Sequence, residues 1–234
     1  MNNLVILLTG TITPNSLFNL TIKDPETRQQ QYEDALNFYI KSTKYKIIFA
    51  ENSGARLENF PNMPERIEYL SFNSQSIEPD RGKAFKEMEI IDFVFQNSKF
   101  LRETEALVKI TGRLKVLNVN KLSQKFLELT RKTPNLIYGY PYRLNNMDAR
   151  CFYFTKDFWP YLKDKGKNIN VNYNFELSLW DAAHEYRKFN EKNYISINPP
   201  PRIKGLSGTF GKKYRHNILF HYGRIIRSLL NNIW

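Results

Sequence analysis

The chain has 234 residues, of which 41% are apolar and 15% aromatic, so it can build a large core and is not a disordered chain. Its net charge of +12 is unevenly distributed. Residues 1–100 hold 11 Lys and Arg against 13 Asp and Glu, whereas residues 101–234 hold 24 against 10. This asymmetry favours an anionic partner for the second half, and nucleic acid, a nucleotide diphosphate and an anionic membrane surface are candidates.

Several classes of protein are excluded by what the sequence lacks. A single cysteine, Cys151, excludes an internal disulfide and favours a reducing compartment. The three histidines are scattered, and neither a Walker A motif nor a GxGxxG motif is present. The start of the chain lacks the basic and long apolar regions of a signal peptide, and no run approaches the roughly 20 apolar residues of a membrane span. We therefore expect a cytoplasmic protein.

The chain opens with a strand–helix–strand pattern. LVILLTG at 4–10 is typical of a buried strand, and YKIIFAENSG at 45–54 is typical of a second one. Between them, apolar residues at helical spacing predict a helix over 24–43, with Asp24 as N-cap and Pro25 at the first helical position. This order predicts a parallel α/β sheet, on which ligands bind at the carboxyl ends of the strands.

The remaining elements follow the same logic. Helices are predicted over 82–101, 121–132 and 174–189, and strands over 66–72, 108–119, 135–143 and 150–162. A loop rich in Pro, Gly and cations spans 199–214. Residues 212–234 carry Lys and Arg without a single acid and end in Ile-Trp, which predicts a basic amphipathic helix after a domain over 1–211. That helix either lies on a membrane surface or docks on the domain.

The segment KITGR combines two cations, a hydroxyl and a glycine. On a continuous strand Lys109 and Arg113 project to the same face, Gly112 permits close approach of a ligand or of another backbone, and Thr111 offers a hydroxyl. The segment is either a phosphate site or a solvated edge strand with ordinary salt bridges. Both interpretations are open from spacing alone.

Three further segments carry chemistry, each with a plainer alternative. Asp148 can ligate a divalent cation or touch a sugar hydroxyl, or it is a turn residue paired with Arg150. Glu176 can act as a general base, or it is an ordinary acid at a helix start. KGLSGTFGKKY, with Lys212 and Lys213, suits a diphosphate as a mobile lid, or it is a surface loop.

The order of KEMEII, SKFL, VKITGR and VLN, followed by MDARCFYFTKDFW, FELSLWDAAH and IKGLSGTFGKKY, resembles bacterial glycosyltransferases of lipopolysaccharide O-antigen and capsule clusters. The likeness is to their GT-A-type single-domain branch, and it runs from LLTGTI to SGTFGKKY. It implies a GT-A-like, Rossmann-type mixed and mainly parallel sheet flanked by helices. It also implies a nucleotide-sugar donor and a glycan or lipid-linked acceptor, with peripheral association at the inner face of the plasma membrane and no nucleic acid.

The same resemblance implies roles for individual residues. Thr9, Gly10, Thr11, Glu51, Asn52 and Ser53 would hold the nucleoside; Lys109, Thr111 and Arg113 would face the donor; and Ser207, Gly208, Thr209, Lys212 and Lys213 would close over the diphosphate. Glu176 would be the base of an inverting transfer. Asp148 stands at the position of a DxD pair, but Arg150 replaces the second carboxylate, so use of Mn²⁺ or Mg²⁺ is an open question and Arg and Lys can supply the positive charge instead. The alternatives are a basic nucleic-acid-binding protein and a non-catalytic membrane-surface scaffold.

Overall fold

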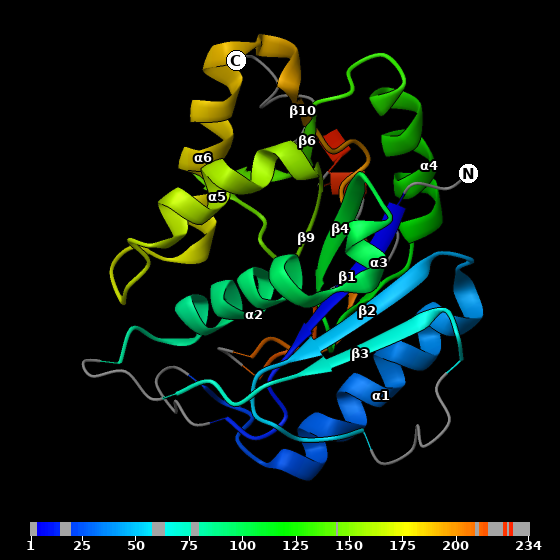
Figure 1. Ribbon diagram of the computed structural model, residues 1–234, viewed down its shortest axis with the longest axis vertical. Coiled ribbons are helices and arrows are strands. Elements are labelled where there is room, and N and C mark those ends of the chain that lie inside the picture. The colour runs from blue at the N-terminus through cyan, green and yellow to red at the C-terminus, as the bar shows by residue number, and fades with distance from the viewer. Residues whose placement is uncertain are drawn as a thin grey trace.

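The centre of the protein is a mixed sheet with helices on both faces (Figure 1). The computed structural model describes residues 4–14, 20–57, 64–75, 80–143, 145–208, 211–214, 222–223 and 225–226. Within these, the seven strands are ordered β10 (Tyr194–Ser196), β6 (Ile137–Gly139), β9 (Cys151–Thr155), β4 (Ala106–Thr111), β1 (Leu4–Gly10), β2 (Lys46–Glu51) and β3 (Ile67–Ser71).

Most neighbouring strands run in parallel. β1 pairs in parallel with β2 and β4, and β2 pairs in parallel with β3, whereas β9 is antiparallel to β4 and β6. All seven residues of β1 are buried, as expected for a central strand of a sheet that is covered on both faces. The predicted mainly parallel α/β sheet is thereby confirmed.

Two hydrophobic cores lie on opposite faces of the sheet. α1 (Pro25–Ser42) and α4 (Val119–Thr130) cover one face, while α2 (Lys83–Asn97), α5 (Trp159–Gly166) and α6 (Phe175–Phe189) cover the other (Figure 1). Alternate side chains of β1 divide between them: Leu4, Ile6 and Leu8 pack in the first core and Val5 and Leu7 in the second. This division follows from the two-residue period of a strand.

The helix starts follow the local sequence. Asp24 Oδ2 accepts a hydrogen bond of 2.8 Å from the backbone N–H of Thr27, and Pro25 opens α1, so the predicted N-cap is confirmed. Asn174 Oδ1 accepts from the backbone N–H of Leu177 at 3.0 Å and caps α6. The cap fixes where α6 begins and so places Phe175 and Glu176 in its first turn.

Two predicted elements are shorter than expected. The helix over 82–101 breaks at Ser98, whose extended backbone and side chain cap a separate short helix, α3 (Lys99–Arg102). The strand over 150–162 ends at Thr155 and continues as a 3₁₀ turn and α5. Pro160 in the first turn of α5 explains the change, because proline has no N–H for a strand ladder but suits the start of a helix.

The strand predicted over 108–119 is confirmed as far as Thr111, where β4 ends, but its continuation is wrong because the chain turns at Gly112. The Gly112 N–H donates to the carbonyl of Thr9 at 2.8 Å, and the Leu114 N–H donates to the carbonyl of Thr111 at 2.9 Å. A Cβ atom at Gly112 would lie only 2.7 Å from the Thr9 oxygen, so the turn requires glycine. Lys109, on β4, and Arg113, beyond the turn, therefore do not share one strand face.

Short elements complete the described chain. These are β5 (Lys115–Val116) paired with β11 (Ile203–Lys204), β7 (Pro141–Arg143) paired with β8 (Asn146–Met147), and 3₁₀ turns at Lys156–Phe158 and Glu191–Asn193. No helix in the described ranges is long and apolar enough to cross a membrane. Of the C-terminal segment, residues 222–223 and 225–226 are helical. Most of the helix predicted over 212–234 lies outside the described residues, so that helix and its boundary stay predictions.

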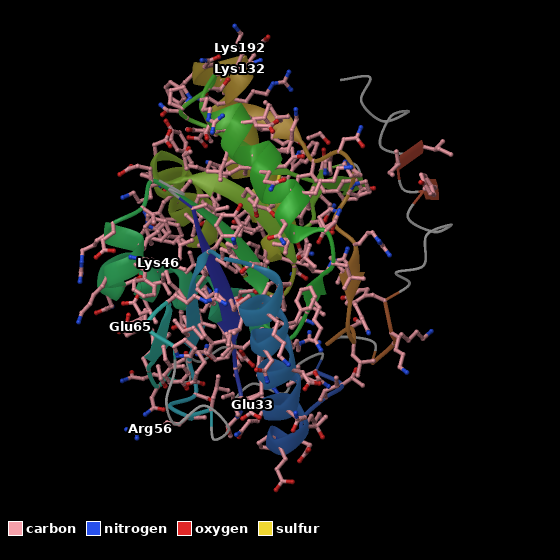
Figure 2. All side chains as sticks on the ribbon, turned by 90° about the vertical axis from the view of Figure 1, so that its right-hand side faces the viewer. Glu33, Lys46, Arg56, Glu65, Lys132 and Lys192 are labelled. Carbon is pink, nitrogen blue, oxygen red and sulfur yellow. The ribbon has the colours of Figure 1, made fainter. Side chains whose placement is uncertain are left out.

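Parts of the two halves of the chain lie toward different ends of the molecule. Figure 2 shows Lys132 and Lys192, from the basic second half, at one end of the molecule. Arg56 and Glu65, from the first half, lie toward the other end. The halves that differ in charge along the chain are thus partly separated in space.

Candidate active site

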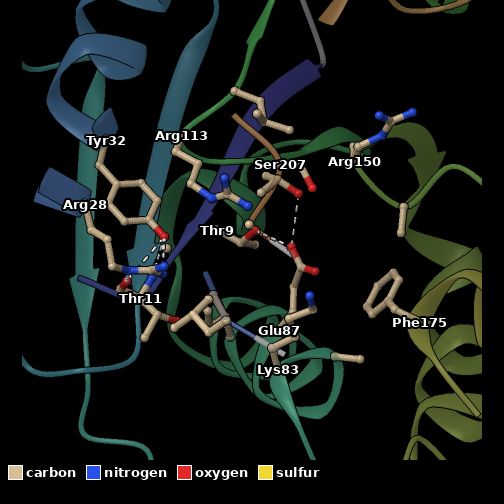
Figure 3. A pocket seen from close by; sticks show the side chains of 18 of the residues that line it. Thr9, Thr11, Arg28, Tyr32, Lys83, Glu87, Arg113, Arg150, Phe175 and Ser207 are labelled. Atoms are coloured by element: carbon tan, nitrogen blue, oxygen red, sulfur yellow. Dashed lines mark hydrogen bonds between the residues drawn. The ribbon is translucent and has the colours of Figure 1, made fainter. Parts of the chain in front are cut away.

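A pocket opens at the carboxyl ends of β1 and β4, where a parallel sheet places ligands (Figure 3). Its wall combines the ends of two strands, three helices and the loop before the C-terminal segment. The lining residues are Thr9, Gly10, Thr11, Leu20, Arg28, Tyr32, Lys83, Ala84, Glu87, Ile90, Thr111, Arg113, Leu114, Ala149, Arg150, Phe175, Glu176, Ser207, Gly208 and Tyr214. Eight of the residues predicted to bind substrate, Arg150 among them, and Glu176 are therefore brought together, from segments far apart in the chain.

Lys109 lies beneath the pocket instead of in its wall. Its side chain is fully buried, and its Nζ lies 2.5 Å from Oε1 of Glu87. The same nitrogen donates to the carbonyl of Ala149 at 2.7 Å and lies between the rings of Phe152 and Phe175. The prediction that Lys109 faces the donor is not supported by this position, because its charge is already matched inside the protein.

Glu87 is a site residue that sequence analysis missed. Its Oε1 also accepts hydrogen bonds from Thr9 Oγ1 at 2.8 Å and Thr111 Oγ1 at 3.4 Å. Burial alone would raise the pKa of this carboxyl, but Lys109 and the hydrogen bonds outweigh burial and hold the pKa below its usual value. The available signal was the spacing of Lys83 and Glu87, one helical turn apart on α2, which also fits an ordinary polar helix face.

Arg28, on α1, is a second residue that sequence analysis missed. It is only 4% exposed. Its Nε donates to the carbonyl of Thr11 at 2.7 Å, its Nη1 to the carbonyl of Ile22 at 3.1 Å and its Nη2 to Tyr32 Oη at 3.0 Å. All these acceptors are neutral, and within the described chain no carboxylate lies at ion-pair distance. A buried charge without a counter-ion is costly, and an anionic ligand would lower that cost.

Arg113 is the second cation of the wall that has no carboxylate in direct contact within the described chain. Its Nη1 donates to the carbonyl of Leu206, and in the described part of the chain it forms no ion pair with a carboxylate. Figure 3 shows its side chain directed into the pocket, and its positive charge contributes to the lowered pKa of Glu87. Arg28 and Arg113 together give this wall a positive charge that the protein does not neutralise by direct contact.

Glu176 lies in the first turn of α6, where it lines the pocket. Burial raises the pKa of its carboxyl, and the negative charges of Glu87 and Asp148 raise it further. A backbone hydrogen bond and Lys109 act in the opposite direction without reversing the shift. Glu87 and Glu176 thus have pKa values moved in opposite directions, an arrangement typical of sites in which one acid exchanges protons and the other stays charged.

Asp148 is paired with Arg150. Arg150 Nη2 donates to Oδ2 at 2.6 Å and Nε donates to Oδ1 at 2.7 Å, while Asp148 is 1% exposed. Burial alone would lower the pKa of the Arg150 guanidinium, but this pair raises it. Arg150 reaches the pocket wall and Asp148 does not.

The described residues do not fit a divalent cation at this position. Both oxygens of Asp148 are taken by Arg150, and within the described ranges no group of three or more His, Cys, Asp or Glu is placed to hold a metal ion. No step proposed for this site uses a metal, and the role of Asp148 as a ligand stays a prediction.

In the glycine–lysine loop, residues 206 and 207 pair with residues 212 and 213. Leu206 bridges Lys213, the Ser207 N–H donates to the carbonyl of Lys212 at 2.9 Å, and the Thr21 N–H donates to the carbonyl of Gly208 at 3.0 Å. Ser207 and Gly208 line the pocket, whereas Lys212 and Lys213 are exposed outside its wall. Thr209 lies outside the described residues.

The end of β2 supports the pocket without lining it. Glu51 is buried and accepts from the Ser53 N–H at 2.9 Å and the Ser53 hydroxyl at 2.6 Å. Asn52 Oδ1 accepts from Thr11 Oγ1 at 2.6 Å, which ties this strand end to that of β1. A role for Glu51, Asn52 and Ser53 in holding a nucleoside therefore stays a prediction.

No protein family model and no curated protein sequence matches the chain. Among solved structures, a protein assigned as a nucleotide-diphospho-sugar transferase of Desulfovibrio desulfuricans G20 is similar with a TM-score of 0.51 at 7% identity, over 84% of this chain and 80% of that chain. A glycosyltransferase involved in glycosylation of the major capsid of PBCV-1 reaches a TM-score of 0.49 at 14% identity, over 84% and 82%. The second likeness is too loose to support an argument. The first shows the fold, so the predicted GT-A-like architecture is confirmed.

Proposed function

We propose that this protein is a glycosyltransferase that moves a sugar from a nucleotide-diphosphate donor to a hydroxyl group of an acceptor. The observation that carries the proposal is the presence, in one pocket of a GT-A-like fold, of an acid with a raised pKa and two guanidinium groups without carboxylate partners. Displacement of a nucleoside diphosphate needs these two things: a base for the acceptor proton and positive charge for the leaving group.

Arg28 and Arg113 are the groups proposed to bind the diphosphate. Planar guanidinium groups pair with phosphate oxygens through two parallel hydrogen bonds, and such charge-assisted bonds are stronger than neutral ones. Both cations are positioned by backbone carbonyls before any ligand arrives, so little reorganisation is needed during the reaction. Ser207 and Gly208 would cover the diphosphate from the side of the loop.

Glu176 is proposed as the general base. In this step the acceptor hydroxyl transfers its proton to the Glu176 carboxylate while its oxygen attacks the anomeric carbon of the donor sugar. The bond from that carbon to the diphosphate oxygen breaks, and the nucleoside diphosphate leaves with the bonding electrons. Attack opposite the leaving group inverts the anomeric configuration. A carboxylate with a raised pKa is a stronger base than an ordinary glutamate, which suits this role.

The acceptor is proposed from the sequence resemblance. A hexose would be transferred to a lipopolysaccharide, capsule or lipid-linked glycan, by an enzyme held at the inner face of the plasma membrane. The positive charge of residues 101–234 supports such a location, because it would be attracted to anionic lipid headgroups. The nucleic-acid alternative has little support, since Phe189 and Tyr222 are the only large aromatic residues that stand exposed among those whose side chains the structure describes.

The test is titration calorimetry of the full chain with UDP-, GDP-, CDP- and dTDP-sugars, followed by a transfer assay with the donor that binds. We expect one nucleotide to bind, and we expect Glu176→Gln to keep donor binding while transfer falls at least about 100-fold. Glu185→Gln is the matched control, because Glu185 lies on the same helix and pairs with Lys165 outside the pocket. Absence of binding to every donor, or full transfer by Glu176→Gln, would overturn the proposal.

A further inference from the structure

The two carboxylate oxygens of Glu87 differ in their contacts: Oε1 is held by the surrounding side chains and Oε2 is not. Lys109, Thr9 and Thr111 all contact Oε1. For Oε2 no hydrogen bond is found within the described residues, and the side chain is 24% exposed in the pocket wall. The contacts from β1 and β4 fix the direction of the carboxylate, so Oε2 is a preorganised acceptor available to a ligand.

The surroundings limit what Oε2 can bind. A metal ion is disfavoured because no second and third acidic, His or Cys ligand accompanies Glu87 in the described chain. Its pKa is lowered, so it is a weak base, and Glu176 is the better proton acceptor. A phosphate would be repelled by the carboxylate. A neutral group that donates a hydrogen bond remains, and in a sugar that group is a hydroxyl.

We propose that Glu87 determines the specificity for the donor sugar, with its Oε2 accepting a hydrogen bond from one hydroxyl of that sugar. This inference rests on the proposed function. The donor would lie with its diphosphate toward Arg28 and Arg113 and its sugar over Glu87. Those two guanidinium groups have no carboxylate in direct contact, whereas the charges of Lys109 and Lys83 already interact with Glu87. A site that hydrogen-bonds a substrate hydroxyl strongly rejects the analogue without it, since Oε2 would then be covered by the bound donor without a hydrogen-bond partner.

The test compares wild type with Glu87→Gln, using the nucleotide sugar that binds in the panel, its mono-deoxy sugar analogues and the corresponding nucleoside diphosphate. With wild type, we expect kcat/KM for one deoxy analogue to be at least about tenfold lower than for the complete donor. This is the loss expected when a hydrogen bond to a charged group is removed. In Glu87→Gln this difference should shrink several-fold, while affinity for the nucleoside diphosphate stays within about twofold.

Two further variants separate recognition from folding. Glu89→Gln is the matched control: it lies on the same helix and contacts Lys86 and Ser74 away from the pocket, so it should keep wild-type discrimination. Lys109→Met/Glu87→Met removes both buried charges together, which protein interiors tolerate better than removal of one. This double variant should lose discrimination entirely, and it provides the answer if Glu87→Gln does not fold.

The possible results are distinct. If no nucleotide sugar binds wild type, both the proposed function and this inference are overturned. If a donor binds but every deoxy analogue behaves alike in wild type and Glu87→Gln, or the nucleoside diphosphate weakens as much as the sugar donor, only the role of Glu87 is overturned.

Discussion

Lys109 Nζ and Glu87 Oε1 lie 2.5 Å apart beneath the pocket, joining the central sheet to α2. Lys109→Met should therefore lower the free energy of unfolding by about 3–5 kcal/mol, because it leaves Glu87 without its counter-ion. Urea denaturation provides the measurement. Lys46→Met is the matched control, since Lys46 and Glu103 are also 2.5 Å apart but 45% and 60% exposed, and the expected change there is about 1 kcal/mol or less. Equal effects of the two variants would contradict the structural role of the buried pair.

Glu176 should set the acid limb of the activity profile. Because its pKa is raised, kcat/KM should fall with decreasing pH around a midpoint above about 4.3, the ordinary value for glutamate. The base is inactive when protonated, so activity is retained above this midpoint and lost below it. A pH series with the donor held well below KM measures the limb, which Glu185→Gln should leave in place. A midpoint at or below 4.3 would exclude Glu176 as the titrating base.

The same pKa shift predicts an effect on stability. Because the folded protein raises the pKa of Glu176, the charged carboxylate destabilises the fold at pH values above the folded pKa, and this cost disappears below the unfolded pKa. Glu176→Gln should thus have a higher Tm than wild type at neutral pH and an unchanged Tm near pH 4. Thermal denaturation at the two pH values measures this. A lower Tm for the variant at neutral pH would show that the charged form is stabilising.

Arg113→Ala should weaken binding of the nucleoside diphosphate by about tenfold or more, since it removes a charge-assisted contact. Its Tm should stay close to that of wild type, because the main partner it loses is one carbonyl of the loop. Titration calorimetry with the nucleoside diphosphate measures the affinity, and Arg102→Ala, an exposed arginine on α3, serves as the control. Unchanged affinity would remove Arg113 from the proposed diphosphate site.

Two glycines of the site should differ in how they respond to alanine. At Gly112 an added Cβ would meet the Thr9 backbone oxygen at 2.7 Å, so Gly112→Ala should destabilise the fold. At Gly208 the nearest atom is Arg113 Nη2 at 2.3 Å, the end of a flexible side chain. Gly208→Ala should therefore keep the Tm and lose diphosphate affinity. Measuring Tm and affinity for both variants checks this, and a stable Gly112→Ala protein would refute the close approach of β4 to β1.

Chelation tests the role of the guanidinium groups. With Arg28 and Arg113 as the proposed positive charge, transfer should keep most of its rate after dialysis against EDTA, measured with and without added Mn²⁺ or Mg²⁺. Arg150 donates hydrogen bonds to both carboxylate oxygens of Asp148, the oxygens that would otherwise ligate a metal ion. A loss of more than tenfold that Mn²⁺ restores would show that a cation binds with the donor after all.

The sequence by itself determined the elements whose signals are local. The unbroken apolar run of β1, the Asp24 cap and the apolar stripe of α6 each depend on residues within a few positions of one another. Such patterns record burial directly, through the periods of strand and helix. These local patterns were also sufficient to predict a ligand site at the carboxyl ends of the parallel strands and to place Glu176 at the start of a helix. In the structure, Glu176 lines the pocket from that position.

Only the tertiary structure decided which polar groups meet. Glu87 reaches Lys109 because α2 packs on β1, the neighbour of β4 in the sheet, and the 21 positions between the two residues in the chain give no sign of this contact. The strand through KITGR ends at Gly112 because the Thr9 carbonyl of a neighbouring strand accepts its N–H. Hydrophobic periodicity specifies which face of an element is buried, whereas ion pairs and turns at strand ends depend on which elements become neighbours. For this reason Lys109 became the support of the site, and Arg28 and Glu87 became part of its wall.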